Sequence, residues 1–250
     1  TLVPSTCSPR LAAKKPTIVS IHAPNAPANN SPGFISSRGS LNAVRTALSL
    51  PDSVKSIGEY AFKNCAELTS ITIPEYVTSI KKNTFENCSK LSNIAITGKM
   101  ALIDEYAFSG CTSLTGISLP DSVTEINRNA FYNCKGLQSI TIPKGMNTIK
   151  SYTFSGCSGL NRITMDDNVI YVENYAFSGC KELKSVTIPD SVMRIGISSF
   201  SGCTSLTNIT IPDGVTEIGE QAFVGCSSLT SIEIPESAKR ISGFLFARSE

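Results

Sequence analysis

The sequence contains no tryptophan and a single histidine, His22. Everything after residue 50 therefore lacks the imidazole that a Ser-His-acid site needs. Neither a glycine-rich phosphate loop nor an H-E-x-x-H motif occurs. These absences argue against an enzyme, and we expect no cofactor and no metal.

Long apolar runs are also missing. No stretch approaches the roughly 18 consecutive apolar residues that indicate a membrane-spanning helix, so no transmembrane segment is expected in this sequence. Acidic residues are absent from the first 50 residues, whose basic residues are Arg10, Lys14, Lys15, Arg38 and Arg45. The formal charge of the whole chain is only +2, and no nucleic-acid partner is expected. Hydrophobic residues make up 41% of the chain, which indicates an ordered protein with a core.

What the sequence does contain is a repeat with a period of 23 residues, and such a period is typical of a solenoid. Eight of its nine cysteines follow this period: Cys65, Cys88, Cys111, Cys134, Cys157, Cys180, Cys203 and Cys226. Phenylalanine keeps the same register from Phe62 to Phe246, and leucine keeps it from Leu68 to Leu229. A whole structural unit is therefore repeated.

The repeating unit, read from Pro51 to Ile73, is P-x-x-V-x-x-I-x-x-x-A-F-x-x-C-x-x-L-x-x-I-x-I. Eight full 23-residue repeats end at Ile234, and a truncated ninth opens at Pro235. We interpret 50–250 as one repeat domain. Residues 1–49 are a basic segment rich in Pro, Ala and Ser that we expect to be mostly irregular. Residues 41–50 are expected to form a degenerate cap, because Leu48 and Leu50 match the strand positions of the first repeat.

Each part of the unit predicts a local structure. Ile71 and Ile73 alternate with Ser70 and Thr72, the period of a strand with one buried face. Stacked repeats would align these strands in a parallel sheet, and the proline that opens the next repeat would end each strand. The A-F-x-x-C part predicts a short helical turn. The repeats that open at Thr97 and Asp166 lack the proline, and we expect local irregularities there.

The regular cysteines allow three interpretations. Zinc ligands usually come as close pairs with nearby histidine, which these cysteines do not provide. Disulfides between successive coils would need side chains that point toward each other, whereas stacked side chains point in parallel. We therefore favour a ladder of buried, reduced thiols that pack as small hydrophobic groups. Cys7 lies outside this ladder.

These repeats resemble the BspA-type leucine-rich repeats of surface proteins in bacteria and parasitic protists. The resemblance rests on P-D-S-V-x-x-I at 51–57, 120–126 and 189–195, on A-F-S-G-C at 107–111 and 176–180, and on the L-x-x-I-x-I strands. It covers 51–250. It implies a leucine-rich-repeat right-handed horseshoe with a parallel β-sheet on the concave face and short strands or helical turns on the return side. It also implies roles in adhesion, host contact or protein recognition.

The function expected from this resemblance and from the missing catalytic residues is protein binding or adhesion at the cell surface or after secretion. The outward strand positions are mostly small and polar, so we expect weak single contacts and an extended or repetitive host or matrix protein as partner. The candidate partner-binding residues are Asn93, Arg162, Thr164, Ser185, Thr187, Asn208 and Thr210. An intracellular, cytoplasmic scaffold and a display stalk without a ligand remain alternatives.

A second candidate surface is marked by tyrosines just before the Ala-Phe pair. They are Tyr60, Tyr106, Tyr152 and Tyr175. Tyrosine is enriched in interfaces, but partial burial beside the phenylalanines would also explain this position, and we favour the latter.

Overall fold

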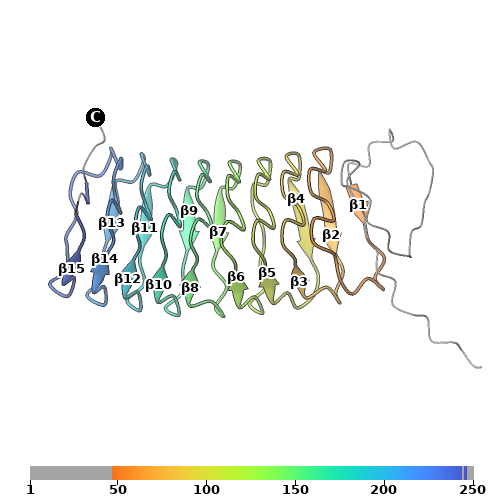
Figure 1. The fold of residues 1–250 in the computed structure, drawn as a ribbon, viewed down its shortest axis with the longest axis horizontal. Helices are drawn as coiled ribbons and strands as arrows, with labels where there is room; N and C mark the ends of the chain where they lie inside the picture. The colour runs from red at the N-terminus through yellow and green to blue at the C-terminus, as the bar shows by residue number, and fades with distance from the viewer. Residues whose placement is uncertain (1–46, 244, 247–250) are drawn as a thin grey trace, which may run out of the picture.

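The computed structural model describes residues 47–243 and 245–246. In these residues the chain winds into a solenoid whose coils stack side by side along the long axis of the molecule (Figure 1). Strands of successive coils pair in parallel, and each residue pairs with its equivalent one repeat later, as Leu48 does with Ile71 and Ile71 with Ile94. The predicted parallel-strand repeat solenoid is therefore confirmed.

The first row of strands is formed by the L-x-x-I-x-I end of each repeat. In the strand that covers Ser70–Ile73, Ile71 and Ile73 are buried and Thr72 is exposed, as expected for a strand with one buried face. The row comprises β1 (Ala47–Ser49), β2 (Ser70–Ile73), β4 (Asn93–Ile96), β7 (Ser139–Thr141), β9 (Arg162–Thr164), β11 (Ser185–Thr187) and β13 (Asn208–Thr210). Between β4 and β7, a single bridge from Gly116 to Ser139 continues it. We call the exposed side of this row the strand face.

A second row of shorter strands follows the proline turn of each repeat. The N–H of Val54 donates to the carbonyl of Pro51 at 3.0 Å, so a tight turn separates the two strands of a coil. The row comprises β3 (Ser79–Ile80), β5 (Leu102–Ile103), β6 (Glu125–Ile126), β8 (Thr148–Ile149), β10 (Tyr171–Val172), β12 (Arg194–Ile195), β14 (Glu217–Ile218) and β15 (Arg240–Ile241). The short strands expected on the return side are present.

The A-F-x-x-C segment is not helical, and the described residues contain no helix at all, so the predicted helical turn is wrong. Each segment holds two residues with positive φ, such as Tyr60 (φ 60°) and Asn64 (φ 61°). Between them, successive N–H groups donate alternately to the next coil and within the same coil. Phe62 donates to Thr84 in the next coil, whereas Lys63 donates back to Tyr60. Because a helix needs consecutive right-handed residues bonded within one segment, the left-handed residues produce stacked turns instead.

Stacked phenylalanine rings run through the centre of the solenoid. Neighbouring ring centroids lie 5.2 Å apart for Phe62 and Phe85, and 5.5 Å apart for Phe131 and Phe154, with ring planes inclined by 2° and 11°. Leucine, isoleucine, valine and cysteine side chains pack around these rings in one continuous core. Each coil therefore buries its apolar side chains mainly against the adjacent coils.

The two repeats that lack the opening proline behave differently. At Asp166 the carbonyl still accepts the usual turn hydrogen bond, from Val169 at 3.1 Å. At the other repeat the turn changes, because Met100 donates to Gly98. A Cβ at residue 98 would lie only 2.0 Å from the carbonyl oxygen of Glu75. The expected irregularity thus occurs near Gly98 and not at Asp166.

The horseshoe that the resemblance implies is not seen in Figure 1, where the coils form a nearly straight row. Strand β1 pairs Leu48 with Ile71 as predicted, whereas residues 1–46, which include Cys7, His22 and most of the predicted cap, lie outside the described residues. No helix that could cross a membrane is found in the part of the chain that the structure describes.

Candidate interaction surfaces

The strand face carries the residues that we predicted to bind a partner. Arg162, Ser185 and Asn208 are equivalent residues of three consecutive coils, and all are exposed. Ser185 pairs with Asn208 between β11 and β13, and β9, which holds Arg162, contacts β11. The three side chains therefore form one column across the strand face.

A second column is formed by Thr164, Thr187 and Thr210, which are exposed two residues further along the same strands. Since alternate residues of a strand share a face, the two columns form one surface. Asn93 is also exposed, but it lies on β4, three coils before Arg162. The structure therefore brings six of the seven predicted residues together and leaves Asn93 apart.

Arg162 is the only charged residue among these seven. Its side chain has no ion-pair partner among the described residues, and a planar guanidinium can bind a carboxylate through two parallel hydrogen bonds. The remaining side chains are small and polar, so this residue is the strongest single contact that the strand face offers.

A second surface, which sequence reasoning did not resolve, is a groove of about 870 Å³ beside the turns of the central coils. Its lining is formed by Glu105, Tyr106, Asn127, Arg128, Asn129, Tyr132, Lys150, Ser151, Tyr152 and Glu173. We call it the tyrosine groove. Its two acidic and two basic residues leave the lining without net charge.

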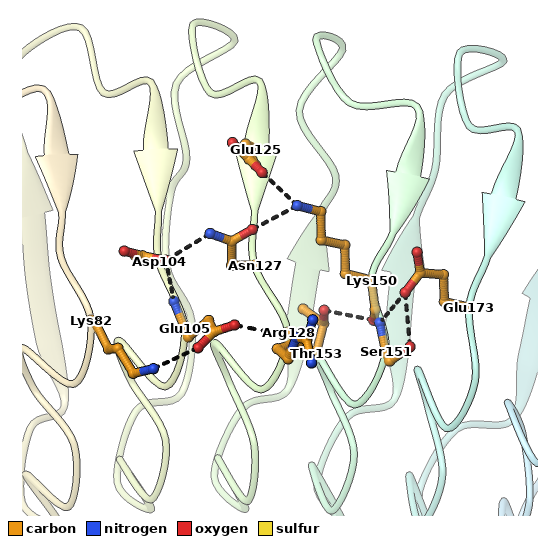
Figure 2. A network of polar contacts seen from close by, with 10 residues as sticks. All are labelled: Lys82, Asp104, Glu105, Glu125, Asn127, Arg128, Lys150, Ser151, Thr153 and Glu173. Carbon is orange, nitrogen blue, oxygen red and sulfur yellow. Dashed lines mark hydrogen bonds and ion pairs between the residues drawn. The ribbon is translucent and has the colours of Figure 1, made fainter.

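Polar contacts that run from coil to coil hold the charged residues of this groove (Figure 2). The Glu105 carboxylate forms ion pairs with Lys82 at 2.8 Å and with Arg128 at 3.2 Å. The hydrogen bond from Lys82 to Glu105, together with their opposite charges, raises the pKa of Lys82. Further along, Lys150 donates to the side-chain oxygen of Asn127 at 2.6 Å.

Further polar contacts extend this network on both sides of Asn127 and Lys150 (Figure 2). The Asn127 amide donates to Asp104 at 2.6 Å, and Lys150 also pairs with Glu125. The Glu173 carboxylate accepts hydrogen bonds from the N–H and the hydroxyl of Ser151, each at 2.8 Å. Because the charged side chains already have partners, the groove offers a ligand mainly aromatic surfaces and amides.

The tyrosines of the shared repeat position are only partly buried. Tyr106 and Tyr175 are half-buried, whereas Tyr60 and Tyr152 are 46% and 37% exposed. The partial burial that we favoured is therefore found at all four residues, and part of each ring stays exposed. Tyr152 stacks on Tyr175 with ring centroids 4.6 Å apart. Partial desolvation, with smaller contributions from Tyr175 and Tyr132, raises the pKa of Tyr152.

The sequence signal for left-handed residues was strong at one of the two positions in each turn and weak at the other. The residue before each repeat cysteine is Asn or Gly throughout, such as Asn64 and Gly110, and these two residues enter the left-handed region most easily. The residue before the Ala-Phe pair is also left-handed, yet it includes Tyr106 and Tyr152. Tyrosine rarely adopts that conformation, so only Asn83 and Asn129 at this position indicated it.

The cysteine ladder is buried, as predicted, except that Cys65 is half-buried. Each later thiol donates to a phenylalanine carbonyl of the preceding coil, as Cys88 does to Phe62 at 3.0 Å. Burial raises the pKa of Cys88 to about 12 and raises that of Cys134 well above its usual value. These two thiols are therefore kept protonated and poorly nucleophilic, whereas the neighbouring Cys203 thiol lowers the pKa of Cys226. Among the described residues, no cluster of His, Cys, Asp and Glu suited to a metal was found.

The chain was compared with known protein families and structures. Six copies of the sequence model for the BspA type leucine rich repeat region match it, over residues 42–161 and 147–250. The crystal structure of a leucine rich cell surface protein from Faecalibacterium prausnitzii A2-165 is similar, with 26% identity and a TM-score of 0.52, over 81% of this chain and 79% of that protein. No curated protein matches the sequence.

Two further solved structures share the fold. The T. pallidum leucine rich repeat protein has 27% identity and a TM-score of 0.53, over 74% of this chain and 78% of that one. The pneumococcal vaccine antigen PcpA has 19% identity and a TM-score of 0.52, over 81% of this chain and 65% of that one, and it supports the fold alone. The repeat unit, the parallel solenoid and the family match agree, and the chain belongs to the BspA-type leucine-rich repeat family.

Proposed function

We propose that this chain is a non-enzymatic protein-binding and adhesion module that acts at the cell surface. The observation that carries the proposal is the two-column surface on β9, β11 and β13, where six exposed side chains repeat at the coil spacing. A surface of this kind suits an extended or repetitive partner. Its site residues are the predicted set: Asn93, Arg162, Thr164, Ser185, Thr187, Asn208 and Thr210.

The proposed location follows from the family and from one relative. The Faecalibacterium prausnitzii protein, which resembles this chain over most of its length, is described as a cell surface protein. Leucine-rich repeat proteins generally bind and do not catalyse, and this supports a non-enzymatic role.

The small polar side chains set the expected strength of binding. Interface energy concentrates in tryptophan, tyrosine and arginine, and of these the strand-face set contains only Arg162. A single copy should therefore bind weakly. Several copies on one surface would gain avidity, because linking binding sites can raise affinity by about 10²–10⁴ without a new contact.

The test is Arg162→Glu, measured as binding of the whole chain to a panel of immobilised extracellular matrix proteins. Loss of the guanidinium and repulsion by the new carboxylate should weaken binding by about tenfold or more, as at an interface hot spot. The matched control is Lys55→Glu, because Lys55 is exposed before the second strand row and forms no ion pair among the described residues. Equal weakening by both variants, or by the control alone, would remove the strand face from the proposal.

A further inference from the structure

The tyrosine column has a gap in the centre of the groove. Four consecutive coils place Tyr106, Asn129, Tyr152 and Tyr175 at the same repeat position, with φ values between 55° and 60°. Tyr152 and Tyr175 stack with centroids 4.6 Å apart. Tyr106 and Tyr152 lie two coils apart, roughly 9–10 Å at the usual strand spacing. The shorter side chain of Asn129 therefore leaves a slot about one aromatic ring thick.

The base of this slot carries an amide that has no hydrogen-bond partner within the described part of the protein. Asn129 is only 9% exposed and lines the groove, yet its side chain forms no hydrogen bond with the described residues. Its amide atoms are not fully buried, because the Ser199 hydroxyl is the only fully buried side-chain N or O atom without a partner among the described residues. Asn83, two coils earlier, is buried to a similar degree, and its amide donates to the Glu86 carboxylate. In the repeat of Asn129, the position of Glu86 is occupied by Tyr132, so the amide remains available to a ligand.

The electrostatics of the groove favour an uncharged group. Glu105 and Arg128 are paired with each other, and Lys150 is paired with Glu125. The Glu173 carboxylate is hydrogen-bonded by Ser151. A charged ligand would have to compete with these contacts, whereas a neutral ring between two tyrosines would leave them intact.

We propose that the slot between Tyr106 and Tyr152 binds an aromatic side chain of a protein partner, specifically a ring with a polar edge such as that of tyrosine. The inserted ring would lie near 4.8 Å from each neighbour, inside the range of about 4.5–7 Å that stacked aromatic pairs adopt. Its hydroxyl would hydrogen-bond the Asn129 amide. This inference rests on the proposed protein-binding function but uses a different surface from the strand face.

The direct test is an NMR titration of the whole chain with N-acetyl-tyrosinamide, followed at the side-chain amide of Asn129. We expect saturable shifts at Asn129 and its neighbours. N-acetyl-phenylalaninamide, which lacks the hydroxyl, should bind about fivefold more weakly, the effect of one net hydrogen bond. N-acetyl-leucinamide should cause no saturable shift. An unmoved Asn129 signal, or equal binding of the leucine compound, would overturn the proposal.

Two variants test the geometry of the slot. Asn129→Tyr should fill the gap and continue the column, because tyrosine already occupies this backbone conformation at Tyr106 and Tyr152. It should weaken binding of the tyrosine compound by about tenfold or more. Gln221→Tyr is the control, since Gln221 is exposed at the same repeat position four coils away, and binding should not change. Unchanged binding by Asn129→Tyr would contradict the slot.

Asn129→Gly covers the case in which the tyrosine variant fails to fold. Glycine accepts the φ of 59° at this residue and removes the whole side chain, including the amide. The preference for the tyrosine compound over the phenylalanine compound should then disappear while both still bind. Arg162→Glu should leave the titration unchanged. Failure of the slot would therefore be distinguishable from failure of the strand-face proposal, which is measured with whole matrix proteins.

Discussion

At the residue scale, comparison of equivalent residues shows which side chains suit a repeat position. A residue that differs from its equivalents can leave a polar group without a hydrogen-bond partner. The residue before each ladder phenylalanine is alanine in most repeats. Thr84 and Thr153 replace it, and their hydroxyls donate to the carbonyls of Lys81 and Lys150 at 2.7 and 2.8 Å. The hydroxyl of Ser199, at the same position, is buried without a partner. Ser199 is therefore a local defect in an otherwise satisfied position.

Ser199→Ala should stabilise the protein. The substitution removes a buried unsatisfied hydroxyl and restores the residue that most repeats contain, for a gain of about 1 kcal/mol in the free energy of unfolding. Urea denaturation monitored by circular dichroism measures the change. Thr153→Ala is the control and should lose about 1 kcal/mol, because its hydroxyl has a partner. A loss of stability in the Ser199 variant would show that its hydroxyl is satisfied in solution.

At the element scale, the turn of each coil depends on two left-handed residues that lie four positions apart, such as Tyr175 and Gly179. They direct alternate N–H groups to the next coil, so the turns stack with backbone hydrogen bonds much as the strands do. Gly179 has a φ of 74°, and a Cβ there would meet its nearest atom at 3.7 Å. Space is available, so only the backbone conformation limits substitution at this residue.

Gly179→Ala should cost about 1–2 kcal/mol, the penalty for a Cβ in the left-handed region. Gly179→Asn should cost less, because asparagine occupies the equivalent site at Asn133 with a φ of 56°. Gly58→Ala is the control, since Gly58 has no neighbour within 4 Å of an added Cβ and no positive φ. Thermal unfolding of the three variants measures the order. If Gly179→Ala is no less stable than Gly179→Asn, the left-handed turn does not exist in solution.

At the scale of the whole molecule, stability is distributed along a one-dimensional stack. Phe131 is fully buried and stacks on Phe108 and Phe154. Phe246 is 48% exposed, and its only ring contact among the described residues is with Phe223. Because each coil packs only on its neighbours, a defect in the centre should separate two halves of the core, whereas a defect at the end should shorten it.

Phe131→Ala should therefore cost about 3–5 kcal/mol, as for other buried phenylalanines. Phe246→Ala should cost less, because half of its side chain is already exposed. Guanidinium denaturation of both variants measures the difference. Both the midpoint of unfolding and the dependence of the unfolding free energy on denaturant concentration are compared. Equal losses for the two substitutions would argue that residue 246 is as well covered as the centre.

The sequence by itself determined the period, the parallel solenoid, the strand row and the buried positions. These features depend on apolar residues that recur at one spacing. The burial of such a recurring side chain can be predicted without knowing which residues contact it. Ile71, Phe85 and Cys88 illustrate this, since all three are buried as the pattern requires.

Only the tertiary structure decided the turn conformation, the nearly straight row of coils and the tyrosine groove. The turn was predicted as helical because the A-F-x-x-C pattern carries no signal for left-handed residues. In the structure, hydrogen bonds from one coil to the next stabilise left-handed residues such as Tyr152, whose N–H donates to Asn174. The groove depends on residues that do not repeat, such as Asn129 and Tyr132. The contacts and charge of the groove depend on the residues one coil before and one coil after each lining residue. Only the stacking of the coils brings these residues together.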